Sequence, residues 1–204
     1  MKLIFILLVL SSYVVLADDD SSSSNNPGVV PVNDANYTEE CGACHFAYQP
    51  GLLPSASWKR IMTSLEDHFG ENAELETKEQ KLLTDYLTKN AAEFSNYKRS
   101  IKIIRSLTKD KIPLRITEMP YIIKKHDELT SAMVIGNPEV KSLSYCDNCH
   151  TKAVTGSYAE DDIIVPGYGN WEEYEHSSSF IGRIKHGAKE IKEYINEEIL
   201  KKYF

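Results

Sequence analysis

All four cysteines of this 204-residue chain fall in two copies of one pattern, C-x-x-C-H, at residues 41–45 and 146–150. Two thiols at this spacing can each add across a vinyl group of one porphyrin, and the histidine that follows can bind its iron. The sequence therefore predicts two covalently bound haem c groups. The predicted thioether cysteines are Cys41, Cys44, Cys146 and Cys149. The predicted proximal iron ligands are His45 and His150.

Two other chemistries use a C-x-x-C pair. It can form a redox-active disulfide, or it can supply half of a zinc site. Neither chemistry needs the histidine that follows, and here that histidine occurs twice while no cysteine is left over. We therefore favour covalent haem at both motifs.

A second axial ligand for the first iron is expected downstream. Apolar residues recur at helical spacing after Ser57, which predicts a helix from Trp58 to Gly70. His68 lies at the edge of that apolar stripe and is the predicted distal ligand. Met62 is its rival, because methionine also serves opposite histidine in c-type cytochromes, although a mid-stripe methionine is more typical of core packing.

The second distal ligand is expected upstream of its motif. Pro120 predicts the start of a short helix in which Ile122 and His126 share a face. His126 is the predicted ligand of the second iron. Met119 is the weaker alternative, since it directly precedes a proline, as distal methionines do in class I cytochromes. Met133 lies in an apolar run and is expected to serve packing.

The remaining pattern predicts a mainly α protein. Thr77 and Gln80 form a possible capping box for a helix with an apolar face. Residues 34–96 then resemble the small class I cytochrome c fold. Residues 97–204 are expected to form a less regular C-terminal haem domain, irregular over 151–170 and ending in a long helix from about Ser178 to Tyr203.

The N-terminus predicts an export signal. Lys2 precedes a 14-residue apolar run, and Ala17 supplies a cleavage site before three aspartates. An uncleaved membrane anchor is the alternative, but a spanning helix needs about 20 apolar residues. We expect cleavage after Ala17 and no membrane span in the mature chain. Residues 18–33, rich in serine and asparagine, are expected to form a flexible leader.

Charge is distributed unevenly along the chain. The formal net charge is −7, which disfavours binding to nucleic acid. Residues 97–125 nevertheless hold nine basic and two acidic side chains, between two acidic regions. Such a basic band is usually a solvated face; it could also screen haem propionates or dock an acidic partner.

Three segments, at residues 41–75, 113–129 and 144–167, resemble the bacterial dihaem cytochrome c family. The resemblance implies histidine ligands on both sides of each iron, His45 with His68 and His126 with His150. It also implies a soluble periplasmic electron carrier. The resemblance further implies redox partners, since some members of the family donate electrons to a small oxygen-binding monohaem cytochrome or work beside a membrane b-type cytochrome.

The predicted function is electron transfer, with no catalytic residues and no enzyme activity, because two saturated irons leave no open coordination site. The partners would be other redox proteins. The alternative is a peroxidase-like dihaem oxidoreductase or a gas-binding haem protein, either of which needs one open iron.

Overall fold

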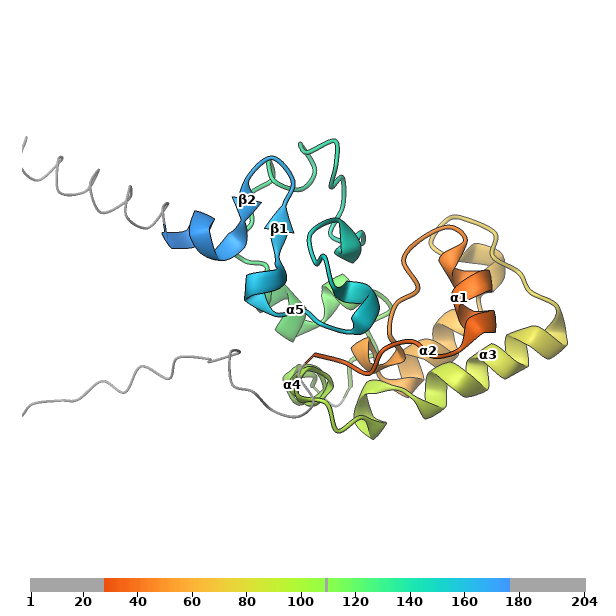
Figure 1. Ribbon diagram of the computed structural model, residues 1–204. Helices are drawn as coiled ribbons and strands as arrows, with labels where there is room; N and C mark the ends of the chain where they lie inside the picture. Colours follow the sequence, from red (N-terminus) through yellow and green to blue (C-terminus); the bar gives the residue numbers. More distant parts are fainter. Residues whose placement is uncertain (1–27, 109, 177–204) are drawn as a thin grey trace, which may run out of the picture.

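The computed structural model describes residues 28–108 and 110–176, and this part of the chain is mainly helical, as predicted (Figure 1). Its longer helices are α1 (Ala35–Gly42), α2 (Ser55–Met62), α3 (Thr77–Lys89), α4 (Lys98–Ser106) and α5 (Pro120–Lys125). Residues 171–176 are also helical. The predicted export signal and the predicted C-terminal helix lie outside the described residues. No helix within those residues is long and apolar enough to cross a membrane.

Short 3-10 helices make up much of the remaining structure. They are Pro50–Leu52, Leu65–Asp67, Ala92–Phe94, Ile116–Glu118, Cys146–Asn148, Ala153–Thr155 and Glu160–Asp162. Strands β1 (Ile164–Val165) and β2 (Gly169–Asn170) form an antiparallel ribbon in which Val165 pairs with Gly169. The region expected to be irregular therefore consists of single turns and one small ribbon.

Helices α2 and α3 pack against each other through their apolar faces. Trp58 and Met62 are buried on α2, and Leu83 and Leu87 are buried on α3. The Trp58 indole donates a hydrogen bond to the Pro50 carbonyl at 2.7 Å, so its polar atom is satisfied inside the core. This helix pair forms the framework beside the first motif.

The start of α3 differs from the prediction in its cap. The helix begins at Thr77, but Glu76 is the capping residue and no side chain caps the helix. Gln80 instead donates its side-chain amide to the Met62 carbonyl at 2.6 Å, at the end of α2. The predicted capping box is therefore wrong, because the glutamine joins two helices rather than closing one.

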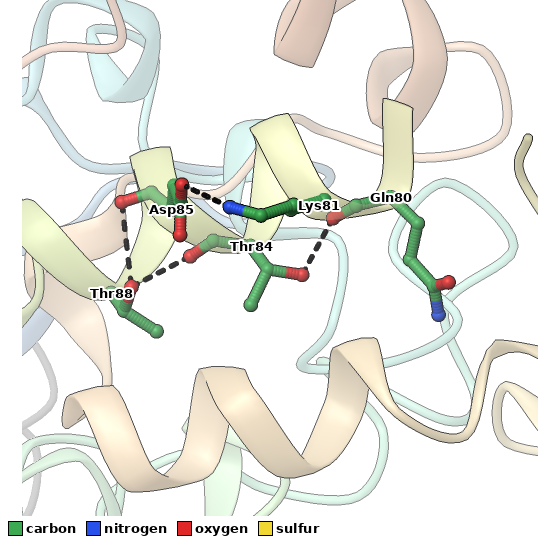
Figure 2. A network of polar contacts seen from close by, with 5 residues as sticks. All are labelled: Gln80, Lys81, Thr84, Asp85 and Thr88. Carbon is green, nitrogen blue, oxygen red and sulfur yellow. Dashed lines mark hydrogen bonds and ion pairs between the residues drawn. The ribbon is translucent and has the colours of Figure 1, made fainter. Parts of the chain in front are cut away.

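The side chains of α3 also bond along their own helix (Figure 2). Thr84 donates to the Gln80 carbonyl at 2.6 Å, and Thr88 donates to the Thr84 carbonyl at 2.7 Å. Lys81 and Asp85, one turn apart, form an exposed ion pair at 3.1 Å. Exposed pairs of this kind stabilise a helix only slightly.

The larger hydrophobic core extends across the predicted boundary between residues 96 and 97. Leu52 and Leu87 lie in it beside Ile103, Met119 and Ala153. Figure 1 shows α1 to α3 on one side of the molecule and α5 with the ribbon on the other. The division into two domains remains a prediction, and the two halves share one core. A second, smaller core contains Met133, Val134, Val140 and Val165.

The predicted flexible leader is wrong from residue 28 onward. Val29 is fully buried, and its N–H donates to the Gly156 carbonyl at 3.0 Å. Gly28 and Gly156 both have positive φ, and a Cβ on Gly156 would lie 2.2 Å from the Val29 oxygen. The valines at the end of the leader supply apolar surface that its polar beginning lacks, so this end packs into the core.

Candidate functional site

The first motif lies where α1 ends. Asp34 caps α1 by accepting a hydrogen bond from the Tyr37 N–H at 2.8 Å. The helix stops at Gly42. Of the two cysteines and the histidine of the motif, only Cys41 therefore lies in the helix, while Cys44 and His45 lie in the turn that follows. The i, i+3, i+4 spacing of the motif predicts one short helix that presents all three groups together, and that prediction is wrong.

His68 lies opposite His45, with the two ring centres 6.1 Å apart and the ring planes 20° from parallel. The predicted helix carrying His68 is wrong, because α2 ends at Met62. There the hydroxyls of Thr63 and Ser64 bond back to the Arg60 carbonyl, which competes with continued helix. His68 instead follows a 3-10 turn.

A tight backbone turn holds His68 in that position. Its N–H donates to the Glu71 carbonyl at 2.7 Å. Phe69, which lies within the helix predicted from Trp58 to Gly70, has φ of 58° and is 44% exposed. The Arg115 guanidinium lies over the Phe69 ring at 4.1 Å, so a basic side chain stands beside this histidine pair.

The second motif forms a 3-10 turn rather than an α-helix. The His150 N–H donates to the Cys146 carbonyl at 2.8 Å, and His150 pairs with Ile163 in a backbone bridge. Pro120 opens α5 as predicted, and His126 follows directly after its last residue. The ring centres of His126 and His150 are 6.0 Å apart, with planes at 74°.

These two separations match a metal held between facing imidazoles. Metal–imidazole bonds in proteins are about 2 Å long, which places the two ring centres about 6 Å apart. Within the described residues, no group of three or more His, Cys, Asp or Glu side chains could hold a metal ion directly. Each pair could therefore hold an iron only together with further ligands, which a porphyrin would provide.

The hydrogen bonds of two rings identify the nitrogen that is free for a metal. The Nδ1 atom of His45 lies 2.7 Å from the Phe46 carbonyl, and that of His126 lies 2.7 Å from the Ile122 carbonyl. A carbonyl oxygen only accepts, so each Nδ1 carries the proton and each Nε2 keeps its lone pair. Metal-binding histidines are typically oriented in this way.

Burial favours the neutral, metal-binding form of His68, His126 and His150. Desolvation, with smaller contributions from His126 and Arg99, lowers the pKa of His150 to about 3. Desolvation is also the main cause of the lowered pKa of His68 and of His126. The Nδ1 atom of His150 is buried and has no hydrogen-bond partner among the described residues.

The four thiols are all unbridged. Burial raises the pKa of Cys41 to about 11 and that of Cys146 to about 12, with nearby carboxylates as a secondary cause. Cys146 and Cys149 line the same cavity as His126 and His150. Its apolar walls include Leu52, Ile122, Leu129, Met133, Val140 and Trp171. This donor set and these walls fit a covalently attached haem.

The methionines occupy packing positions. Met62 and Met119 are buried in the larger core, at 3% and 0% exposure. Met119 is not among the residues that line the cavity at the second motif, whereas His126 is. Met133, expected to serve packing, is buried in the smaller core. The structure thus places histidine rather than methionine opposite each proximal histidine.

Sequence reasoning missed several aromatic and polar neighbours of the histidines. Tyr48 stacks on His45 with ring centres 5.0 Å apart, and Tyr158 meets His150 edge-on at 5.0 Å. Arg99 lines the cavity at the second motif and donates a hydrogen bond to the Tyr158 carbonyl at 2.9 Å. Only Tyr48 could have been suspected from the sequence, because it lies three residues after His45. The other contacts join distant parts of the chain.

Comparison with known proteins identifies the family of this chain. A family model described as dihaem cytochrome c matches residues 37–158. A dihaem cytochrome type c from Shewanella baltica OS155 has 40% identity and a TM-score of 0.57, covering 67% of this chain and 96% of its own. A dihaem cytochrome c from Rhodobacter sphaeroides has 38% identity and a TM-score of 0.57, covering 64% and 100%. Among curated proteins, no significant match is found.

A mainly helical fold with two C-x-x-C-H motifs and two facing histidine pairs defines a c-type cytochrome with two haems. The chain belongs to the dihaem cytochrome c family, and its cofactors are two haem c groups.

Proposed function

We propose that the protein is a periplasmic electron carrier in which each haem iron has two histidine ligands. His45 and His68 would bind the first iron, and His126 and His150 the second. The observation that carries this proposal is the pair of ring-centre separations, 6.1 and 6.0 Å, in which each pair includes the histidine of one attachment motif.

Electron transfer without catalysis follows from that ligation. Two histidines occupy both axial positions of an iron and leave no position for a substrate, so the bound haem supplies only the change of redox state. Histidine ligation on both sides also favours a lower potential than a histidine–methionine pair, because a methionine ligand raises it. We propose that the protein is not an enzyme.

The proposed location and partners rest on the sequence. The apolar run before Ala17 supports export, and the family resemblance supports the periplasm. The partners would be other redox proteins, such as a small oxygen-binding monohaem cytochrome or a membrane b-type cytochrome. The basic band at residues 97–125 would suit an acidic partner.

Spectroscopy of the purified protein tests this function. The oxidised protein should give electron paramagnetic resonance signals of low-spin iron only, and its near-infrared spectrum should lack the band of a methionine–iron bond. The reduced protein should not bind carbon monoxide. Carbon monoxide binding at one haem would contradict the proposal and support the peroxidase-like or gas-binding alternative.

A further inference from the structure

The segment that follows the first motif also contacts the second. The Tyr48 ring stacks on His45, while its hydroxyl donates to the Ser144 carbonyl at 2.5 Å. Ser144 lies 96 residues further along the chain and two residues before Cys146. One side chain therefore touches the proximal histidine of one site and anchors the backbone that leads into the other.

Gln49 makes a second connection of the same kind. It is fully buried, and its amide nitrogen donates to the Ala153 carbonyl at 2.5 Å. Its amide oxygen accepts from the Tyr158 hydroxyl at 2.6 Å, and the Tyr158 ring lies against His150. Residues 48 and 49 are thus bonded to three points around the second motif.

These contacts make the relative position of the two sites well determined. A buried polar group left without its partner destabilises the fold, so displacing one site from the other would be opposed by the loss of several hydrogen bonds at once. Fully satisfied buried networks also specify one arrangement over its neighbours. The Tyr37 hydroxyl adds to the rigidity by donating to the Tyr48 carbonyl at 2.7 Å.

We propose that Tyr48, Gln49 and Tyr158 form a clamp that holds the two haem groups in a defined relative position and thereby sets the rate of electron transfer between them. This inference rests on the proposed electron-carrier function. Electron tunnelling falls exponentially with distance, so a small loosening between the sites slows transfer. The three residues are positioning residues, because they act through the histidines and the backbone.

The two tyrosines allow a clean separation of their ring and hydroxyl contacts. Tyr48→Phe keeps the ring on His45 but removes the bond to Ser144. Tyr158→Phe keeps the ring on His150 but removes the bond to Gln49. Tyr168→Phe is the matched control, because Tyr168 is 36% exposed and its ring contacts Tyr174 rather than a histidine.

The experiment uses the full-length protein with both haems. Pulse radiolysis of half-reduced protein gives the rate of electron transfer between the haems, and spectroelectrochemistry gives their two potentials. We expect Tyr48→Phe and Tyr158→Phe each to slow transfer severalfold while both haems stay low-spin. Tyr168→Phe should match the wild-type protein, and the double variant should lose less than the product of the single effects.

Three results would overturn the clamp. Wild-type transfer rates in both phenylalanine variants would show that the hydroxyls do not set the geometry. A change confined to the spin state of the haem beside the substituted ring would show that the tyrosine acts at one site only. Single effects that simply multiply in the double variant would show that the two tyrosines do not act together. Failure of the proposed electron-carrier function can be told apart from failure of the clamp, because it would already appear in the spectra and carbon monoxide binding of the wild-type protein.

Discussion

Two residues seven positions apart, Met119 and His126, are the candidates for the distal ligand of the second iron. His126 lines the cavity beside His150, whereas Met119 is fully buried in the larger core. We therefore expect His126→Ala to open the second iron and His68→Ala to open the first. Each variant should become partly high-spin and bind about one carbon monoxide per chain, since one ligand is lost from one iron.

Met119→Leu is the control for that pair of variants. It keeps an apolar side chain of similar volume, so it should leave both irons low-spin and cost little stability. If His126→Ala stayed low-spin while Met119→Leu gained a carbon monoxide site, the ligand assignment at the second iron would be wrong.

Candidate cofactor-binding residues could be located from the sequence because covalent haem attachment imposes a fixed spacing. Cys41, Cys44 and His45 are identified by their pattern alone. The predicted ligand His68 lies opposite His45, although the helix predicted to carry it does not form. Tyr158 could not be found in this way, because it reaches Gln49 across 109 residues and no local pattern encodes such a contact.

At the scale of elements, hydrophobic periodicity located a helix near residue 58 but neither of its ends, since α2 begins at Ser55 rather than at Trp58. The apolar spacing from Trp58 continues to Phe69, yet α2 stops at Met62. The hydroxyls of Thr63 and Ser64 bond to the backbone of the preceding turn, and a positive φ at Phe69 excludes further helix. The hydrophobic spacing identifies buried residues as far as Leu65, which lies in a 3-10 turn, but it fails at the exposed Phe69.

The packing of α3 can be tested with two neighbouring leucines. Leu83 is 1% exposed in the core, whereas Leu82 is 56% exposed. Leu83→Ala should lower the free energy of unfolding by about 2–5 kcal/mol, because it removes buried methyl groups and leaves a cavity. Leu82→Ala should change it by less than about 0.5 kcal/mol. Denaturant unfolding followed by circular dichroism measures both, and equal losses would contradict the burial of this helix face.

The contact between the N-terminal segment and the loop at Gly156 provides another test. Gly156→Ala would strain a residue at φ of 76° and force its Cβ against the Val29 carbonyl. Gly167→Ala is the matched control, because Gly167 has φ of 77° but no atom within 4 Å of an added Cβ. The control should cost about 1–2 kcal/mol for the left-handed backbone alone.

Gly156→Ala should therefore lower the thermal midpoint of unfolding further than Gly167→Ala does. The difference between the two variants measures the close approach of the two segments. Equal midpoints would mean that the N-terminal segment moves aside at little cost.

At the scale of the whole molecule, the export prediction concerns the first residues of the sequence. If the apolar run is a signal cleaved after Ala17, protein isolated from cells should begin at Asp18 and be found in the periplasmic fraction. N-terminal sequencing or intact mass measurement shows this directly. An intact Met1 in the membrane fraction would support the anchor alternative instead.

The sequence predicted a mainly helical chain, and the structure confirms this, but the shared core could not be predicted. A boundary at residue 96 follows from the change in charge at Tyr97. Charge describes the surface, however, while Ile103 and Ala153 join Leu52 and Leu87 in the interior. A sequence read one segment at a time contains no signal for which apolar faces meet.

The hydrogen bond between Val29 and Gly156 has a consequence for how the protein is made. It joins two residues 127 positions apart, one before the first attachment motif and one after the second. A chain delivered from its N-terminus cannot close this contact until residue 156 has emerged. By then both C-x-x-C-H motifs have been made as well, so both haems can be attached while this contact is still open. Val29 can therefore take its place against Gly156 only after both attachment motifs have been made.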